Sequence, residues 1–297
     1  MKMLKNILMG FRMLFTHYSV YASAIFTAVL CLCGAIYHDP IKNESYSAIK
    51  VLMEFDRKSM LDNTAFCSRQ IIANINGSWL SMFLPVIAAF AFVTIVCDER
   101  ESKAVRNTVF RSSRTGYYAS RFVMICLSGG IAVLLGFALF AGVIGVTFPD
   151  INQYSLELQE QIRNSLGYLG PDFSEPHLFF LIGQKFLVMF LYGFVSAAPA
   201  ALLTSILRNK YLILCIPFFM KYVCTQICEK LISQALVNRE SPDMNFLGLV
   251  RILSPDSISN LFQSGNKIYI MFYHFGLVAV AFVSYMLIWN RRFDSGE

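Results

Sequence analysis

The feature that most constrains this chain is a charged stretch held between two long apolar segments. Residues 79–97 and 122–148 contain no charged side chain, and Asp98–Arg121 lies between them. About 20 apolar residues in a helix cross the hydrocarbon core of a bilayer, so both segments are predicted to span a membrane. The stretch between them holds six Lys and Arg against three acids. Short basic loops stay in the cytoplasm, which predicts a cytoplasmic loop here.

The rest of the chain repeats this alternation. Hydrophobic residues make up 56% of the 297 and charged residues only 15%, whereas soluble domains carry about 25% charged residues. We therefore expect an all-α integral membrane protein formed as one domain over 1–297, with six transmembrane helices. The predicted spans are about 18–37, 79–97, 122–148, 178–207, 211–232 and 268–290. The net charge of +6 follows from basic loops and does not indicate nucleic-acid binding.

Six spans put both termini on one side, which the basic loops identify as the cytoplasm of a multi-pass protein of the cell membrane. Residues 1–17 place Leu4, Ile7, Phe11 and Leu14 at helical spacing and predict an amphipathic helix in the interface. Segments 38–78, 149–177 and 233–267 are then external. We expect a short helix near 49–55 and, in the third segment, short helices that dip into the outer leaflet.

Several motifs have an ordinary structural interpretation. Leu127-Ser128-Gly129-Gly130 matches the core of the ABC ATPase signature, but it lies inside an apolar span, far from any nucleotide. No phosphate-binding G-x-x-x-x-G-K-[ST] sequence occurs, so this chain is not expected to bind ATP in that way. Small residues four apart in the third span predict close helix packing; the pairs are Ala132/Gly136, Ala138/Gly142 and Ala141/Gly145.

Charged and polar residues within the predicted spans include Lys185, Lys221, Glu229 and His274. Charges in a bilayer are costly, so they should pair or face a polar cavity. Counting from the turn near residue 209, Lys185 and Glu229 have similar heights on antiparallel helices, which predicts an ion pair between them. We expect His274 to be a hydrogen-bonded packing residue rather than a ligand.

The eight cysteines indicate no disulfide framework, and no metal site is predicted. Seven of them lie in or beside apolar segments. Cys67 alone lies in a polar loop, where an impermeant thiol reagent should label it if the thiol is free.

The charged stretch also carries a resemblance. Glu99 and Glu101 come first, followed by Arg106-Asn107-Thr108, Ser113-Arg114, Tyr117-Tyr118 and Ser120-Arg121. This order resembles the cytoplasmic loop of ABC-2 type permeases, including those of the bacitracin and lantibiotic-immunity type. Further resemblance lies in 205–211 with Pro217-Phe218-Phe219, and in Leu253-Ser254-Pro255. Ala104 and Arg121 depart from the glycine and lysine common in the family.

The resemblance implies a membrane subunit of an ABC exporter that moves a peptide or lipid-like substrate outwards. It implies pairing with a second permease copy or homologue in the lipid membrane, and docking on two cytoplasmic ATPase subunits that hold ATP and Mg²⁺. A coupling helix between the second and third spans would contact the ATPases. Its candidate residues are Glu99, Glu101, Arg106, Arg111, Arg114 and Tyr117.

Two other classes are alternatives. An ATP-independent secondary transporter should show inverted repeats with broken helices and acids at the membrane midplane, and no such repeat is visible. A membrane scaffold or sensor protein is the second alternative. No nucleophile–base pair suggests an enzyme or a cofactor in this chain. A neighbouring gene for an ATPase, or co-purification with one, would separate these classes.

Overall fold

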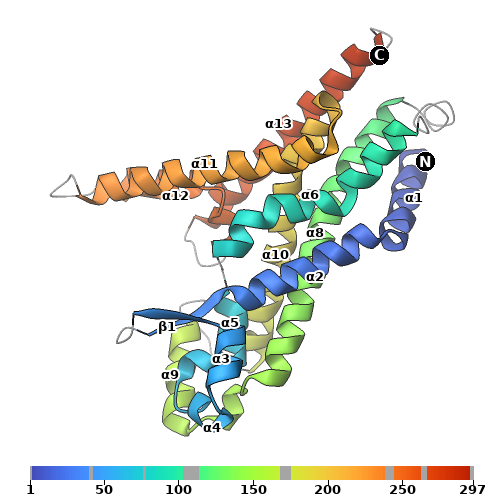
Figure 1. The fold of residues 1–297 in the computed structure, drawn as a ribbon. Helices are drawn as coiled ribbons and strands as arrows, with labels where there is room; N and C mark the ends of the chain where they lie inside the picture. Colours follow the sequence, from blue (N-terminus) through green and yellow to red (C-terminus); the bar gives the residue numbers. More distant parts are fainter. Residues whose placement is uncertain are drawn as a thin grey trace.

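A computed structural model of the chain describes residues 2–39, 43–75, 78–102, 114–167, 175–237, 244–261 and 266–294. The body of the molecule consists of long helices (Figure 1): α1 Lys2–Thr16, α2 Tyr18–Cys33, α6 Ser78–Glu101, α8 Arg114–Thr147, α10 Glu175–Ile206, α11 Lys210–Val237 and α13 Lys267–Asp294. Shorter elements connect them: β1 Ala35–Asp39, β2 Glu44–Ser47, α3 Ala48–Glu54, α4 Arg57–Met60, η1 Thr64–Phe66, α5 Ser68–Asn74, η2 Ile151–Gln153, α9 Leu156–Gly167, α12 Met244–Leu253 and η3 Ser257–Asn260.

The long helices agree with the prediction of a multi-pass membrane protein. Within the described residues, five helices are long and apolar enough to cross a membrane: α6, α8, α10, α11 and α13. A sixth crossing requires α1 and α2 together, and these two helices are bent by 63° relative to each other. The bend lies at His17, whose ring nitrogen caps α2 by accepting from the backbone N–H of Ser19.

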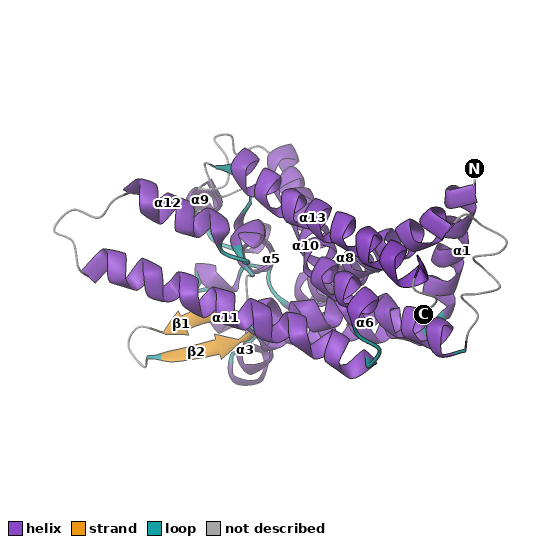
Figure 2. Ribbon diagram, turned by 90° about the horizontal axis from the view of Figure 1, so that it is seen from above, coloured by secondary structure: helices purple, strands orange, loops and turns teal. Residues whose placement is uncertain are grey.

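Both chain ends lie at the same end of the molecule in both views (Figures 1 and 2). We call this the terminal end. The opposite end carries the strands with α3, α4, α5 and α9, and we call it the distal end. A chain whose two termini lie at the same end agrees with an even number of membrane crossings. Which end faces the cytoplasm stays a prediction.

The first predicted span is wrong at its distal boundary. The sequence predicts a helix that runs to residue 37, but α2 ends at Cys33 and Gly34 turns the chain into the extended region. Ala35–Asp39 then pairs antiparallel with Glu44–Ser47, with Tyr37 opposite Tyr46. The physical reason is aromatic packing: the Tyr37 ring lies 5.4 Å from the ring of Phe66, which draws this segment onto the distal end.

The two segments predicted to be external, 38–78 and 149–177, pack against each other at the distal end. The expected short helix near 49–55 is present as α3. Arg69 makes two hydrogen bonds to the Asp150 carboxylate, at 2.8 and 3.1 Å. The Tyr154 hydroxyl donates to the carbonyl of Met60 at 3.3 Å. We call this unit the distal cap.

The distal cap buries the Cys67 thiol completely. Labelling of Cys67 by an impermeant reagent is therefore no longer expected. Burial also raises the pKa of this thiol, so the reactive thiolate is scarcer at neutral pH.

We expect Cys67 to resist a membrane-impermeant maleimide in intact cells and to react after denaturation. A cysteine placed at Glu160, an exposed position on α9, serves as the matched control and should react in intact cells. Mass spectrometry of the labelled chain measures both. Labelling of Cys67 as fast as Glu160→Cys would contradict the buried cap.

Glycines set the closest helix contacts of α8. A Cβ on Gly129 would meet Ala197 Cβ at 2.9 Å and the carbonyl of Ala88 at 3.0 Å, so α8 touches α10 and α6 here. The sequence that matched the ATPase signature is thus a packing site. Among the small-residue pairs, Gly136 lies against α2, whereas Gly142 and Gly145 have nothing within 4 Å of an added Cβ. The prediction of close helix packing is confirmed for Gly136 of the first pair. It is wrong for Gly142 and Gly145.

The predicted amphipathic helix is present as α1, which packs on one side. Leu14 is fully buried, and Gly10 lies against Met124 of α8. Leu8 and Phe15 are exposed on the other side. Such an apolar face suits a helix that lies in a membrane interface.

Candidate functional site: polar networks at the terminal end and within the bundle

The terminal end of the bundle holds a buried ion pair between α6 and α8. The Arg121 guanidinium contacts the Glu99 carboxylate at 2.5 Å, with the two side chains 5% and 15% exposed. The Tyr117 hydroxyl donates to the other oxygen of Glu99 at 3.1 Å. Arg121 also lies over the rings of Tyr117 and Phe92, at 5.1 and 5.8 Å. These contacts fasten the end of α6 to the beginning of α8, on either side of the basic loop.

Two further residues, Arg100 and Lys210, extend this network to α10, α11 and α13. Arg100 donates to the carbonyls of Thr204 and Leu207, at 2.8 and 3.0 Å, where α10 ends. Its guanidinium lies 5.3 Å from the ring of Trp289 on α13. Lys210 begins α11 and lies 3.5 Å from the Asp98 carboxylate. Arg100 satisfies carbonyls that a helix end leaves unpaired. We call the set Asp98, Glu99, Arg100, Tyr117, Arg121 and Lys210 the terminal network.

The structure places the predicted coupling residues in different surroundings. Glu99 and Tyr117 are brought together, and Glu101 is exposed in the last turn of α6. Arg114 begins α8. Arg106 and Arg111 lie outside the described residues, as does the whole of segment 103–113 of the predicted coupling helix.

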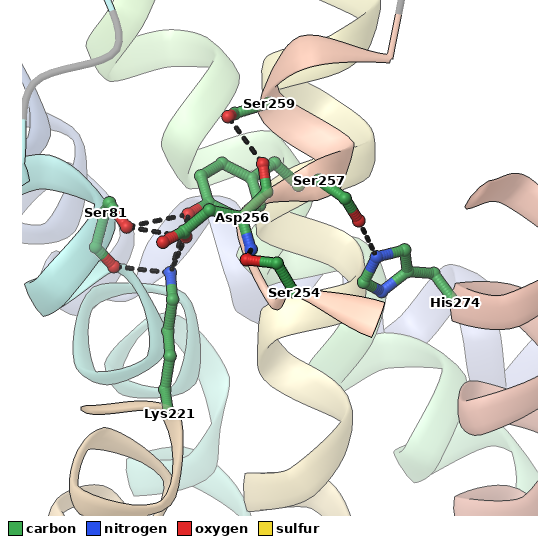
Figure 3. Close-up of polar contacts among 8 residues, drawn as sticks. Ser81, Lys221, Ser254, Asp256, Ser257, Ser259 and His274 are labelled. Carbon is green, nitrogen blue, oxygen red and sulfur yellow. Dashed lines mark hydrogen bonds and ion pairs between the residues drawn. The ribbon is translucent and has the colours of Figure 1, made fainter. Parts of the chain in front are cut away.

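Within the bundle, Lys221 of α11 forms the centre of a second polar group (Figure 3). Its ammonium lies 2.9 Å from the Asp256 carboxylate and donates to the Ser81 carbonyl at 2.5 Å and the Tyr192 hydroxyl at 2.6 Å. The Ser81 hydroxyl donates to Asp256 at 2.6 Å, and Tyr192 donates to the same carboxylate. We call Ser81, Tyr192, Lys221 and Asp256 the polar cluster.

The polar cluster joins helices far apart in the chain. Ser81 belongs to α6, Tyr192 to α10 and Lys221 to α11, while Asp256 follows α12. The Lys221 side chain is 9% exposed and that of Asp256 28%. Burial raises the pKa of Asp256, but the Lys221 ammonium and the donated hydrogen bonds outweigh it, so the pKa lies below its ordinary value. This lowered pKa agrees with the geometry, in which the Asp256 carboxylate lies in contact with the Lys221 ammonium.

The neighbouring residue continues the connection to α13. The Ser257 hydroxyl lies 2.7 Å from His274 Nε2, and His274 is 3% exposed. His274 is thus a hydrogen-bonded packing residue, as predicted. Figure 3 shows Asp256 and Ser257 directed to opposite sides of the same short segment, one towards Lys221 and the other towards His274.

The predicted ion pair between Lys185 and Glu229 is wrong. Lys185 is buried in α10, whereas Glu229 is exposed on α11 and lies 3.4 Å from the Gln226 amide. Figure 1 shows the reason: α11 leaves α10 soon after the turn, so equal counts along the two helices do not bring side chains together. The buried lysine of α11 pairs instead with Asp256.

Sequence reasoning misses most of both networks. It does not single out Ser81, Tyr192 or Asp256, nor Arg100 and Lys210 as network members. A signal is present at Asp256, because an acid beside Leu253-Ser254-Pro255 in an apolar external segment needs a partner. Another is present at Arg121, which belongs to the loop resemblance although it is not among the predicted coupling residues.

Both networks consist of ion pairs and hydrogen bonds that join neighbouring helices. The polar cluster satisfies the three donors of the Lys221 ammonium with three oxygens. Among the described residues, no group of three or more His, Cys, Asp or Glu side chains could hold a metal ion. The arrangement fixes helices relative to one another.

Comparisons with known proteins add no assignment: no protein-family model, curated protein or solved structure matches this chain.

Proposed function

We propose that this chain is the membrane-spanning permease subunit of an ATP-driven exporter of the ABC-2 type. In this proposal two separate cytoplasmic ATPase subunits bind and hydrolyse ATP, and the chain moves a peptide or lipid-like molecule out of the cell. The resemblance of the basic loop to that family is one support. The observation that carries the proposal is the terminal network, which connects both ends of that loop to the bundle.

A loop that transmits work needs a stiff connection to the helices it moves. Glu99 and Arg121 join α6 to α8 across the base of the loop. Arg100 holds the end of α10, and Lys210 brings the beginning of α11 to Asp98. A push on the loop would therefore displace the ends of these four helices together rather than only bend a loop. Such packed and hydrogen-bonded chains of contacts are the physical means by which distant sites become coupled.

The test is co-purification with an ABC ATPase encoded beside this gene. The wild-type chain should retain the ATPase through detergent extraction and size-exclusion chromatography. Reversing two loop charges, Arg111→Glu with Arg114→Glu, should reduce the retained ATPase about tenfold, because charge reversal at an interface costs roughly 1.4 kcal/mol or more.

The matched control is Arg251→Glu, an exposed arginine on α12, away from the basic loop. It should retain the ATPase as the wild type does, and all three proteins should reach the membrane in equal amounts. Equal retention by the loop variant, or a chain that never binds the ATPase, would refute the proposal and favour a transporter or scaffold that works without ATP.

A further inference from the structure

Three donor groups of the polar cluster meet at a single atom, Oδ1 of Asp256. The Ser81 hydroxyl donates to this oxygen at 2.6 Å, the Lys221 ammonium lies 2.9 Å from it, and the Tyr192 hydroxyl also donates to it. We call these three groups the donor trio. One cation and two hydroxyl groups around one oxygen are suited to bind the charged oxygen of an anion, whether a carboxylate or a phosphate.

The donor trio belongs to the helix bundle. Ser81, Tyr192 and Lys221 lie on α6, α10 and α11, which are all long and apolar enough to cross a membrane. The three residues also hold one another, because the Lys221 ammonium donates to the Ser81 carbonyl at 2.5 Å and to the Tyr192 hydroxyl at 2.6 Å. The same ammonium lies 4.6 Å from the centre of the Tyr192 ring. None of these contacts involves Asp256, so the donors should keep their positions without it.

The acceptor, in contrast, belongs to a short connection between helices. Asp256 lies between α12 and η3, outside the membrane-crossing helices. Figure 3 shows its carboxylate reaching from this segment towards Lys221. The Asp256 side chain is 28% exposed, whereas that of Lys221 is 9% exposed. The side of the site that opens to the surface is therefore the side that Asp256 fills.

The helix that leads to Asp256 indicates what surrounds this opening. α12 exposes Phe246, Leu249 and Leu253, which lie three and four residues apart and share one face. A short helix with an exposed apolar face suits the boundary between lipid tails and head groups. An anionic group can thus reach the opening either from a lipid head group or from a molecule in water.

We propose that the donor trio binds one oxyanion group of the transported molecule, a carboxylate or a phosphate, and that Asp256 occupies the site when this molecule is absent. The inference rests on the proposed function for the identity of the ligand, and it adds the chemical class of that ligand. Exchange of the Asp256 carboxylate for another oxyanion keeps the buried Lys221 ammonium paired. The exchange therefore avoids the large cost of leaving a buried charge without a counter-ion.

Rescue of an Asp256 variant by added anions tests the site. In Asp256→Ala, sodium acetate or sodium phosphate should raise the apparent melting temperature of the purified protein in detergent, because a ligand of the folded state stabilises it. In the wild type the tethered carboxylate competes, so the half-maximal effect should need at least about tenfold more anion. Asp256→Asn, which keeps an oxygen for Ser81 and Tyr192, is measured in the same way and gives a second folded variant.

Two control variants separate binding from the general effect of salt on stability. Lys221→Met/Asp256→Ala removes the cation of the donor trio and should show no anion-specific rise. Glu229→Ala removes an exposed carboxylate from the same helix as Lys221 and leaves the site intact, so it should respond as the wild type does.

Added lipid distinguishes the two sources of the anion. Micelles that contain phosphatidylglycerol are compared with micelles that contain zwitterionic phosphatidylcholine. A rise in Asp256→Ala with phosphatidylglycerol, and none with acetate or phosphate, would assign the site to a lipid phosphate. A rise with the soluble anions would assign it to an anionic group that arrives through water.

The expected result is a rise in the Asp256 variants that is absent from Lys221→Met/Asp256→Ala. Equal rises in all variants, or no rise with acetate, phosphate or phosphatidylglycerol, would overturn the site. The ATPase co-purification described above is measured on the same proteins. A chain that holds its ATPase without anion rescue refutes this site alone. A rescued chain that never holds an ATPase keeps the anion site and refutes the proposed function.

Discussion

Replacing Asp256 with alanine should destabilise the protein by about 3–5 kcal/mol, because it leaves the Lys221 ammonium buried without its counter-ion. The Lys221 side chain is 9% exposed and lies in the middle of α11. The same change removes the acceptor for the Ser81 and Tyr192 hydroxyls. We expect a clear fall in the apparent melting temperature of the detergent-solubilised protein.

A double variant distinguishes a broken ion pair from general damage. Lys221→Met with Asp256→Asn removes both charges while keeping an amide oxygen that accepts from Ser81 and Tyr192. It should recover about half or more of the lost stability, since removing both partners costs less than stranding one. The comparison pair is Arg69–Asp150, whose side chains are 22% and 37% exposed. Breaking that pair with Asp150→Ala should cost only about 1 kcal/mol. Equal melting temperatures for Asp256→Ala and the wild type would contradict the role given to the polar cluster.

The substitution Gly136→Ala should lower the free energy of unfolding by about 1–3 kcal/mol. An alanine Cβ there would fall inside van der Waals contact of the Ala24 carbonyl and the Thr27 side chain, so α2 must move away from α8. Gly142→Ala is the matched control on the same helix, where nothing lies within 4 Å. Alanine is the better helix former by up to about 1 kcal/mol, so the control should be neutral or slightly stabilising. Melting temperatures that fall equally in both variants would exclude close α2–α8 packing as the cause.

The membrane-crossing helices could be predicted from the sequence because long apolar segments have few alternatives. The helices α6, α11 and α13 cover the corresponding predicted spans, and α8 and α10 end one residue short of theirs. His274 could be interpreted correctly because a lone histidine in an apolar helix needs only one hydrogen-bond partner, which Ser257 provides. Charge order indicated a basic loop, and Glu99 with Tyr117 lies at its base.

Pairings between distant residues could not be predicted in the same way. The Lys185–Glu229 pair was inferred from helix length alone, which assumes that α10 and α11 stay side by side. The strand pairing of Ala35–Asp39 depends on aromatic contacts with Phe66, which is distant in the sequence, and periodicity does not record such contacts. Asp256 reaches Lys221 only because α12 and η3 fold back onto the bundle, an arrangement set by tertiary packing.

The bend between α1 and α2 has a consequence for the lipid around the protein. α2 has 16 residues, which corresponds to about 24 Å of helix, several ångströms less than a hydrocarbon core of roughly 30 Å. The strand β1 after Gly34 leads into the distal cap, and α1 is bent by 63° relative to α2. Neither neighbour therefore lengthens the helix along its own axis. Hydrophobic mismatch of this kind is relieved when the bilayer thins beside the short helix. The surface formed by α2 should thus gather shorter lipid chains than the surface formed by α8, giving the protein two sides that prefer different membrane thicknesses.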